Sequence, residues 1–208
     1  MFFRRKGEKE HTQLNDINSG IEYIIVGLGN PGRQYAGTRH NAGFITIDSL
    51  AEKLGVKIDR IKFKAVCCQA TVGGKRVLLL KPQTFMNNSG EAVVQATKFY
   101  KIPPERTIII FDDISLEPGQ LRIRRKGSDG GQKGMRSIIY LSGSDAYPRI
   151  KMGVGAKPNP SWDLADWVLS GFKKDETEKL MSAVDKAHAA LELMVNGGID
   201  MAMNKFNS

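Results

Sequence analysis

The sequence predicts one α/β domain, a three-layer sandwich in which helices flank a mixed, largely parallel central sheet. Two segments, YIIVGL from Tyr23 and RTIIIFDD from Arg106, are mostly apolar, as expected for strands buried on both faces. Segments with apolar residues at helical spacing separate the strands along the chain, which is typical of parallel sheets. A length of 208 residues fits one domain with a full core.

The N-terminal part of the chain contains an extension, a strand and a helix. Residues 1–20 are polar, mixed in charge and without periodicity, so we expect a flexible extension before a domain over residues 21–208. The strand at Tyr23 leads into a polar loop. Apolar residues then recur at helical spacing between Asn41 and Leu54, which predicts a helix there.

The middle of the chain contains a hairpin and a second helix. Residues 62–82 alternate in polarity around a Gly73-Gly74 turn, which predicts two paired strands. The helix that follows has Asn88 and Glu91 at the spacing of a capping box. The hairpin therefore adds an antiparallel element to the parallel sheet.

The second half of the chain alternates strands and helices to its end. Asp112 stands at the carboxyl end of RTIIIFDD, and LRIRRK from Leu121 alternates like a strand with one face in water. We expect a helix over about residues 133–141 and a last strand from Arg149. The final helix has an apolar stripe that we assign to core packing: Leu180, Val184, Ala187, Leu191 and Met194.

The chain as a whole is basic. Lys and Arg number 31 against 22 Asp and Glu, which gives a net charge of +9 and a pI near 9.6. This charge favours an anionic partner such as nucleic acid, but a solvated basic surface explains it equally well. The clustering of the charge has to decide between the two.

The sequence predicts neither a membrane segment nor a metal site. The N-terminus lacks the apolar stretch and cleavage site of a signal peptide, so we expect a cytoplasmic protein. Cys67 and Cys68 are adjacent in a predicted strand, where their side chains point to opposite faces and do not bond to each other. Two adjacent cysteines and three scattered histidines have no zinc-ligand spacing, and we expect no metal and no cofactor.

The loop after the first strand, GLGNPG from Gly27, matches the G-x-G-x-x-G pattern of dinucleotide-binding proteins. In those proteins the loop opens into a helix whose amides face the pyrophosphate, but no helical spacing follows Gly32. Asp48 stands at about the right distance for the ribose-binding acid, but inside a predicted helix. We therefore reject a dinucleotide site.

The same loop is dense in polar side chains: Asn30, Tyr35, Arg39, His40 and Asn41. Among the three histidines, His40 alone stands in such a group. A general base near neutral pH needs an imidazole with an anionic neighbour, and Asp112 at an adjacent strand end is placed to supply that charge. Taken alone, a loop histidine is more often structural than catalytic.

Two further regions each have a structural and a functional interpretation. Asn87 in QTFMNNSG either caps a helix or offers an amide to a ligand. Arg122 and Arg124 share one face of a predicted strand, where with Lys151 they form either a phosphate clamp or a solvated edge that prevents strand pairing. More basic residues surround the turn GSDGGQKG: Arg125, Lys126, Lys133 and Arg136.

Three segments, VGLGNPGRQYAGTRHNAGF, TFMNNSGEAV and FDDISLEPG, resemble the bacterial peptidyl-tRNA hydrolase family in order and spacing, over residues 23 to about 195. The resemblance implies that His40 activates the water that attacks the ester carbonyl and that Asp112 orients the imidazole. It also implies that Asn30 distinguishes an N-blocked peptidyl group from a free aminoacyl group.

The resemblance further implies a substrate-binding surface. Four residues fall at positions that line the family's cleft for the peptide and the terminal nucleotide: Tyr35, Phe85, Met86 and Asn87. Arg124 and Lys151 fall where the family has a clamp for the tRNA 5′-phosphate. The family's usual GGHNG turn is GGQKG here, with Gln132 and Lys133 at the His and Asn positions, and the resemblance implies that both belong to the substrate-binding and tRNA-binding surface. That Asn contacts substrate in the family, and a lysine donates there as a flexible point charge of different reach.

The implied function is metal-independent hydrolysis of the ester bond of peptidyl-tRNA, which releases tRNA and the peptide, by a carboxylic ester hydrolase that we expect to be a monomer. The alternative is a non-catalytic RNA-binding protein on the same scaffold, because a group II intron splicing factor resembles this fold. The altered turn favours the alternative. The trio of His40, Asp112 and Asn30 favours the enzyme, since a non-catalytic protein has no chemical need for it.

Overall fold

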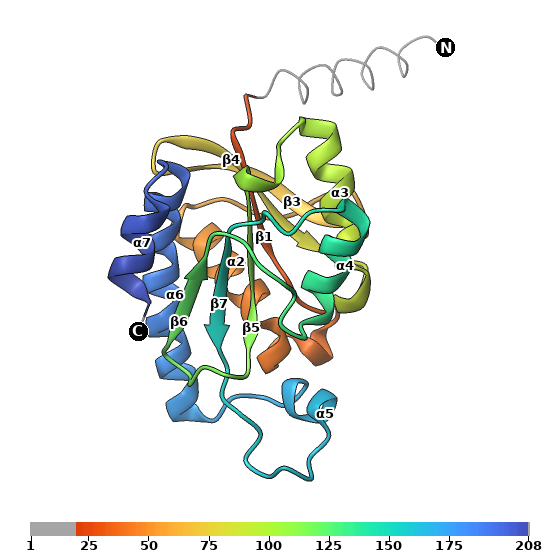
Figure 1. Ribbon diagram of the computed structural model, residues 1–208, viewed down its shortest axis with the longest axis vertical. Helices are drawn as coiled ribbons and strands as arrows, with labels where there is room; N and C mark the ends of the chain where they lie inside the picture. The colour runs from red at the N-terminus through yellow and green to blue at the C-terminus, as the bar shows by residue number, and fades with distance from the viewer. Residues whose placement is uncertain (1–19, 208) are drawn as a thin grey trace.

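The structure is a computed structural model that describes residues 20–207, and in this part of the chain seven strands form one mixed sheet (Figure 1). The strands are β1 (Tyr23–Gly27), β2 (Arg60–Lys62), β3 (Ala65–Val72), β4 (Lys75–Pro82), β5 (Thr107–Asp113), β6 (Leu121–Arg124) and β7 (Arg149–Gly153). Their order is β2-β3-β4-β1-β5-β7-β6, with β4, β1, β5 and β7 parallel and the others antiparallel to their neighbours. The predicted mixed, largely parallel sheet is confirmed.

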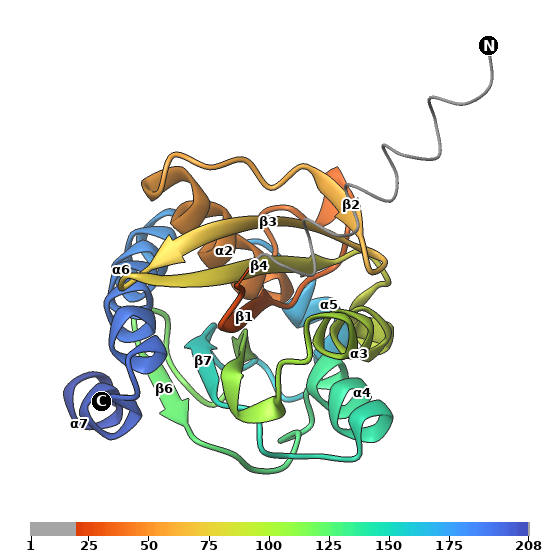
Figure 2. The same cartoon turned by 90° about the horizontal axis from the view of Figure 1, so that it is seen from above.

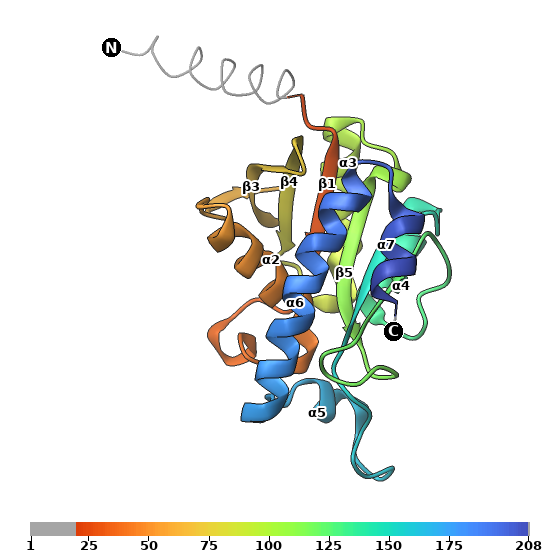
Figure 3. The ribbon, with the colours of Figure 1, turned by 90° about the vertical axis from the view of Figure 1, so that its left-hand side faces the viewer.

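Helices cover both faces of the sheet, which confirms the three-layer sandwich (Figure 2). The α-helices are α2 (Ala42–Lys53), α3 (Ser89–Tyr100), α4 (Lys133–Ser142), α5 (Leu164–Val168), α6 (Lys174–Val195) and α7 (Ile199–Phe206). One layer contains α2, α6 and α7, and the opposite layer contains α3 and α4. Figure 3 shows α6 running along most of the length of the sheet. The short helix α5 lies beyond the ends of β5 and β7 (Figure 1).

The central strand β1 shows why a continuous apolar segment suits this fold. Ile25 packs in the core on the α2 and α6 side, whereas Ile24 and Val26 pack on the α3 and α4 side, and all three are fully buried. Each such side chain contributes roughly 1.5–3 kcal/mol to folding when it is removed from water. The alternation of faces along the strand therefore ties the two helical layers to one sheet.

The predicted helices and strands occur close to their expected bounds, and all five residues of the apolar stripe on α6 are buried. Three elements were not predicted: β2, α5 and α7. With three and five residues, β2 and α5 are too short to show periodicity, and Ile61 in β2 is 84% exposed. Of the predicted extension, residues 1–19 lie outside the described residues.

The predicted capping box of α3 is wrong. Asn88 does occupy the N-cap position, but its side chain makes no capping hydrogen bond, and Glu91 lies 2.6 Å from Lys64 instead. The N–H of Gly90 donates to Ser137 Oγ on α4 at 3.0 Å. A neighbouring helix therefore supplies the acceptor that the local motif was expected to supply. A Cβ on Gly90 would lie 2.4 Å from the Ser137 carbonyl, so this close contact requires glycine.

The two cysteines are not joined in a disulfide, and their side chains point to opposite faces of β3 as predicted. Burial raises the pKa of Cys68 to about 11, and the neighbouring Cys67 adds to the effect. A thiol with this pKa is a weak nucleophile at neutral pH. Between residues 20 and 207, no helix combines the length and apolar character that crossing a bilayer requires.

Candidate active site

A cavity of about 600 Å³ lies where the carboxyl ends of the parallel strands meet. Its walls come from the loops after β1, β4 and β5, from the Gly-rich turn before α4, and from α5. In open parallel sheets this edge is where ligands bind, because the loops that follow neighbouring strands converge there. The cavity therefore collects residues that are far apart in the sequence.

His40 and Asp112 face each other at this cavity. The Nδ1 atom of His40 lies 2.8 Å from Oδ2 of Asp112, and the two side chains are 14% and 4% exposed. A short 3-10 turn, Arg39–Asn41, presents the imidazole, and β5 delivers the carboxylate at its end. Because an ionised carboxylate only accepts, Nδ1 carries the proton and Nε2 is left as an acceptor. The predicted proximity of these two residues is confirmed.

Gln132 is the second partner of the Asp112 carboxylate. Its Nε2 donates to Oδ1 at 3.0 Å, and its Oε1 accepts from the Met135 N–H at 2.8 Å as the N-cap of α4. The residue is only 8% exposed. The resemblance implies a substrate-binding role for Gln132, which lines the cavity, and its amide pairs with other groups of the protein.

Asn30 is held rigidly at the cavity wall. Its backbone N–H donates to Asn41 Oδ1 at 2.8 Å, and its carbonyl accepts from Asn41 Nδ2 at 3.0 Å. The Met86 N–H donates to Asn30 Oδ1 at 2.8 Å, so the amide nitrogen is left as a donor. Within residues 20–207, Nδ2 of Asn30 makes no hydrogen bond. Asn41, predicted as part of the polar loop, is thus the buried clamp that positions Asn30.

Three residues after β4 form another wall, as the resemblance implied. Phe85, Met86 and Asn87 all line the cavity. Phe85 adopts φ +56, which is unusual for a residue with a side chain, and remains 51% exposed. Tyr35 lies outside the cavity lining and contacts Phe85 edge-to-face, with ring centroids 6.4 Å apart. Asn87 lies within a 3-10 turn and not at a helix N-cap.

Lys151 lines the cavity as part of an ion pair. Its Nζ lies 2.9 Å from Asp113 Oδ2, and the side chains are 22% and 10% exposed. Burial raises the pKa of Asp113, but hydrogen bonds from Lys151 and Ser115 outweigh it, so the pKa lies below its usual value. Lys151 therefore presents a charge that Asp113 partly compensates. Sequence patterns did not single out Asp113.

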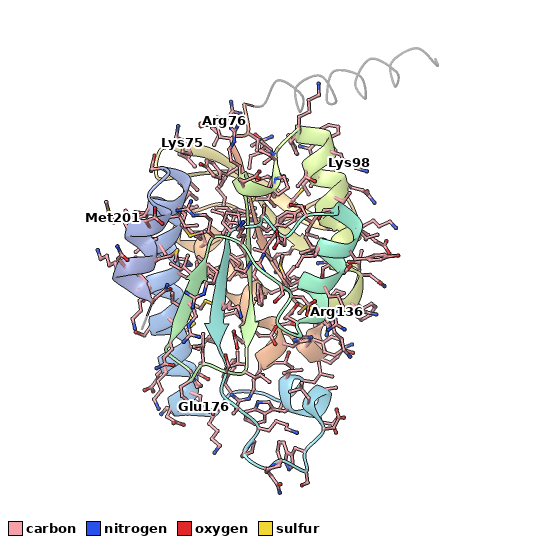
Figure 4. All side chains as sticks on the ribbon, in the orientation of Figure 1. Lys75, Arg76, Lys98, Arg136, Glu176 and Met201 are labelled. Atoms are coloured by element: carbon pink, nitrogen blue, oxygen red, sulfur yellow. The ribbon has the colours of Figure 1, made fainter. Side chains whose placement is uncertain are left out.

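A basic strip continues from Lys151 across the edge of the sheet. Arg122 on β6 stands opposite Lys151 on β7, and exposed Arg124 follows two residues later on the same face. Arg124 does not line the cavity, so it contributes to a surface next to it. Lys133 lines the cavity, and Arg136 lies one turn further along α4 (Figure 4).

Arg39 is structural, although it belonged to the predicted polar cluster. It is 1% exposed, and its guanidinium lies 3.8 Å from the centroid of the Trp167 ring. It donates to the Val154 carbonyl and to Glu176 at the start of α6, each at 2.7 Å (Figure 4). These contacts attach α5 to the turn that carries His40. No sequence pattern indicated them, because the ion pair joins residues 137 positions apart.

α5 contributes an apolar wall that the sequence did not predict. Leu164, Val168 and Leu169 line the cavity on the side facing away from the sheet. Among the described residues, no group of three or more His, Cys, Asp and Glu side chains is arranged to hold a metal ion. The arrangement therefore offers an acceptor nitrogen, amide donors and apolar walls in one cavity.

Comparisons with known proteins agree with this architecture. The sequence profile of the family described as "Peptidyl-tRNA hydrolase" matches residues 24–208. A Caldicellulosiruptor bescii protein named peptidyl-tRNA hydrolase is 48% identical over 187 residues, 90% of this chain and 97% of that protein. A Caldanaerobacter subterraneus protein of the same name is 51% identical over 185 residues, 89% of this chain and 99% of that protein.

A solved structure supports the same conclusion. The crystal structure of peptidyl-tRNA hydrolase from Acinetobacter baumannii is similar with a TM-score of 0.85 and 36% identity. The match covers 90% of this chain and 95% of that one. Sequence and fold agree over nearly the whole described chain, and we conclude that this chain belongs to the peptidyl-tRNA hydrolase family.

Proposed function

We propose that this protein hydrolyses the ester bond of peptidyl-tRNA and releases free tRNA and the N-substituted amino acid or peptide. The observation that carries the proposal is the His40–Asp112 pair, whose 2.8 Å contact leaves the other imidazole nitrogen without a hydrogen-bond partner among residues 20–207, in a cavity with amide donors. Membership of the family supports the same reaction. Because its substrate is tRNA, we place the protein in the cytoplasm.

In the proposed reaction, Nε2 of His40 takes a proton from a water molecule, whose oxygen forms a bond to the ester carbonyl carbon. The Asp112 carboxylate stabilises the imidazolium through its hydrogen bond to Nδ1. When the tetrahedral intermediate collapses, the ester C–O bond breaks, and the imidazolium returns the proton to the ribose oxygen of the tRNA. General-base catalysis of this type contributes typically about 10²- to 10⁴-fold to the rate.

Donors near the dyad are placed to stabilise the negative oxygen of the intermediate. The side chains of Asn87 and Lys133 both line the cavity. An amide or ammonium donor aimed at an oxyanion lowers the barrier because negative charge develops there only in the transition state. We assign this role to these two residues.

Asn30 is proposed to read the blocked amino group of the substrate. Because its Oδ1 accepts from the Met86 N–H, the amide presents its Nδ2 donor to the cavity. A donor there pairs with a peptide carbonyl but repels the protonated amino group of an aminoacyl-tRNA. The same orientation thus favours peptidyl-tRNA and spares charged tRNA.

The basic strip is proposed to bind the acceptor end of the tRNA and its 5′-phosphate. Arg124 and Lys151 lie on one face of paired strands, and Lys151 also lines the cavity, so phosphate and ester are bound side by side. We also propose that the protein acts as a monomer.

Turnover of N-acetyl-aminoacyl-tRNA and of unblocked aminoacyl-tRNA tests the proposal. With chelator present, we expect hydrolysis of the blocked substrate alone, and a loss of about 10²- to 10⁴-fold in kcat for His40→Ala. His188→Gln is the matched control, because this histidine lies in the α2 and α6 layer, away from the cavity.

Full activity of His40→Ala would refute the assigned mechanism. Tight tRNA binding by the wild-type protein without any turnover would favour the non-catalytic RNA-binding alternative, which the replacement of the usual asparagine by Lys133 motivates.

A further inference from the structure

Both ends of the side-chain amide of Gln132 form hydrogen bonds within the protein, and their partners are buried or catalytic groups. Its oxygen accepts from the Met135 N–H, and its nitrogen donates to Asp112 Oδ1 and lies 3.0 Å from Met86 Sδ. Met135 and Met86 are 0% and 3% exposed. Gln132 thus joins the N-terminus of α4 to the carboxylate that orients His40.

The amide has only one workable orientation. If it were flipped, its oxygen would face the Asp112 carboxylate, and its NH₂ group would face the Met135 N–H. Both contacts would then pair like with like at a buried side chain, and the hydrogen bonds on both sides would be lost. The N-cap of α4 therefore fixes which end of the amide meets Asp112.

Tight packing prevents the amide from moving away. A Cβ on Gly134 would lie 2.6 Å from Met86 Sδ and 3.1 Å from Gln132 Oε1. Because glycine occupies this position, the methionine sulfur packs directly on the first turn of α4. Met86 Sδ and Asp112 Oδ1 both contact the amide nitrogen of Gln132 and confine it together.

We propose that Gln132 is a positioning residue for the hydrolytic reaction. It holds the Asp112 carboxylate in the plane where Oδ2 accepts from His40 Nδ1, so that Nε2 faces the cavity as a base. The inference deepens the proposed function and rests on it. It also removes Gln132 from the substrate-binding residues, since its donor and acceptor are already paired.

The other charged side chains that line the cavity make no hydrogen bond to the Asp112 carboxylate. The remaining charged side chains that line the cavity are Asp113, Asp129, Lys133, Lys151 and Asp163. Asp113 and Lys151 are paired with each other, and Asp129 lies 3.4 Å from Arg136. Among the described residues, the carboxylate of Asp112 hydrogen-bonds only to His40 and Gln132.

Gln132→Ser separates the two contacts of the amide. Serine is a favoured N-cap and keeps the acceptor for the Met135 N–H, but it does not reach Asp112. We expect kcat for N-acetyl-aminoacyl-tRNA to fall roughly 10- to 100-fold with KM unchanged, as for other residues that orient a catalytic group. Gln69→Ser, the same change on β3 outside the cavity, is the control and should leave kcat unaltered.

Gln132→Glu tests the role through the pH dependence of kcat, which would not change if Gln132 only capped α4. A glutamate still caps α4, because a carboxylate is favourable at a helix N-terminus. The substitution also places a second carboxyl group against Asp112, and the two carboxyl groups share a proton at low pH. When that proton is lost, the added negative charge stabilises the imidazolium form of His40. We expect the acidic limb of the pH profile of kcat to move up by about one pH unit.

Three outcomes overturn the inference. In Gln132→Ser, an unchanged kcat would show that the amide only caps the helix, and a raised KM with constant kcat would show a substrate contact. The third outcome is a pH profile of kcat that does not change in Gln132→Glu. This outcome tests the inference even if Gln132→Ser does not fold. Failure of the proposed function is distinguishable, because wild-type protein would then show no turnover to compare.

Discussion

At the scale of single residues, Asp112 is constrained by two donors on different segments. Oδ2 accepts from His40 on the loop after β1, and Oδ1 accepts from Gln132 before α4. A carboxylate with one partner rotates about its bond to Cβ, whereas one with both oxygens paired keeps one plane. The orientation of the imidazole is therefore decided by three segments together.

Asp112→Asn should inactivate the enzyme through the wrong histidine tautomer. Gln132 offers an N–H to Oδ1, so the new amide must turn its oxygen there and its NH₂ group to His40 Nδ1. Nδ1 then accepts, Nε2 carries the proton, and the base is lost. We expect kcat to fall about 10²- to 10⁴-fold with little change in KM, measured on N-acetyl-aminoacyl-tRNA.

The same reasoning predicts coupling between the two positions. In a Gln132→Ser background, the amide introduced by Asp112→Asn is free to turn its oxygen to His40, so this second substitution should cost less than it does in the wild-type protein. A double-mutant cycle measures this difference. Strictly additive losses would contradict the proposed orientation of the amide.

At the scale of elements, the cavity is built by loops and short helices attached to a rigid sheet. β1, β4 and β5 are locked by parallel pairing. The loops after β1 and β4 carry Asn30 and Met86, and the end of β5 carries Asp112. α5 is only five residues long and is attached through Trp167, whose ring stacks on Arg39 and whose indole N–H donates to the Gly155 carbonyl at 2.9 Å. Its position depends on tertiary contacts, because a helix this short is not stable alone.

The edge strand β6 combines an exposed basic face with a blocked edge. The backbone N–H of Ile123 donates to Asn207 Oδ1 at 2.6 Å, and its carbonyl accepts from Asn207 Nδ2 at 3.2 Å. The asparagine amide thus occupies the hydrogen-bonding groups of Ile123 that another strand would use. Protection of the edge by Asn207 lessens the need for Arg122 and Arg124 to serve that purpose, which favours their interpretation as phosphate-binding residues.

Arg124→Ala should weaken tRNA binding most at low salt. Each lost phosphate contact lowers the slope of log K against log salt by about 0.7 to 0.9. Titrations of uncharged tRNA at several salt concentrations measure the slope. Lys57→Ala is the control, because Lys57 is exposed in the loop before β2 at the opposite edge of the sheet. Equal slopes for wild type and Arg124→Ala would place the tRNA surface elsewhere.

At the scale of the whole molecule, a buried histidine joins the two long helices of one layer. His188 on α6 lies 1% exposed with Nε2 at 3.1 Å from the Thr46 carbonyl of α2. Its Nδ1 has no partner among the described residues. Burial lowers the pKa of His188, and the nearby charge of Lys53 adds to this, against the opposing effect of the hydrogen bond to Thr46.

The stability of the protein should therefore fall as the pH drops below about 6.5, the ordinary pKa of histidine. In that range the unfolded chain binds a proton at His188 before the folded one does, so the free energy of unfolding decreases with falling pH. Urea denaturation at pH 7 and pH 5 measures the effect. His188→Gln keeps a donor for Thr46 without titrating and should show a smaller decrease.

An equal decrease in both proteins would contradict this assignment. The carboxylates Asp113 and Glu176 have pKa values below normal, but they contribute little to the change in stability between pH 7 and pH 5. Their stabilisation is present above their unfolded pKa values of 3.8 and 4.5 and is lost only as the pH falls through the lower folded values.

The sequence by itself determined the main strands and helices and placed His40 and Asp112 near the ends of neighbouring strands. Continuous apolar segments and helical spacing are local patterns, and they follow directly from which faces of each element are buried. The two residues were expected to meet because loops after neighbouring parallel strands converge at one edge of a sheet. That rule holds even though they are 72 positions apart.

Only the tertiary structure decided which polar groups pair with one another. The Ser137 cap of α3, the burial of Arg39 under Trp167 and the hydrogen bond from Gln132 to Asp112 all join separate elements. At two of these places, a local motif predicted a capping box and the family resemblance implied a substrate-binding residue. A polar side chain pairs with whatever donor or acceptor packing brings within about 3 Å, and that distance is set by the whole fold.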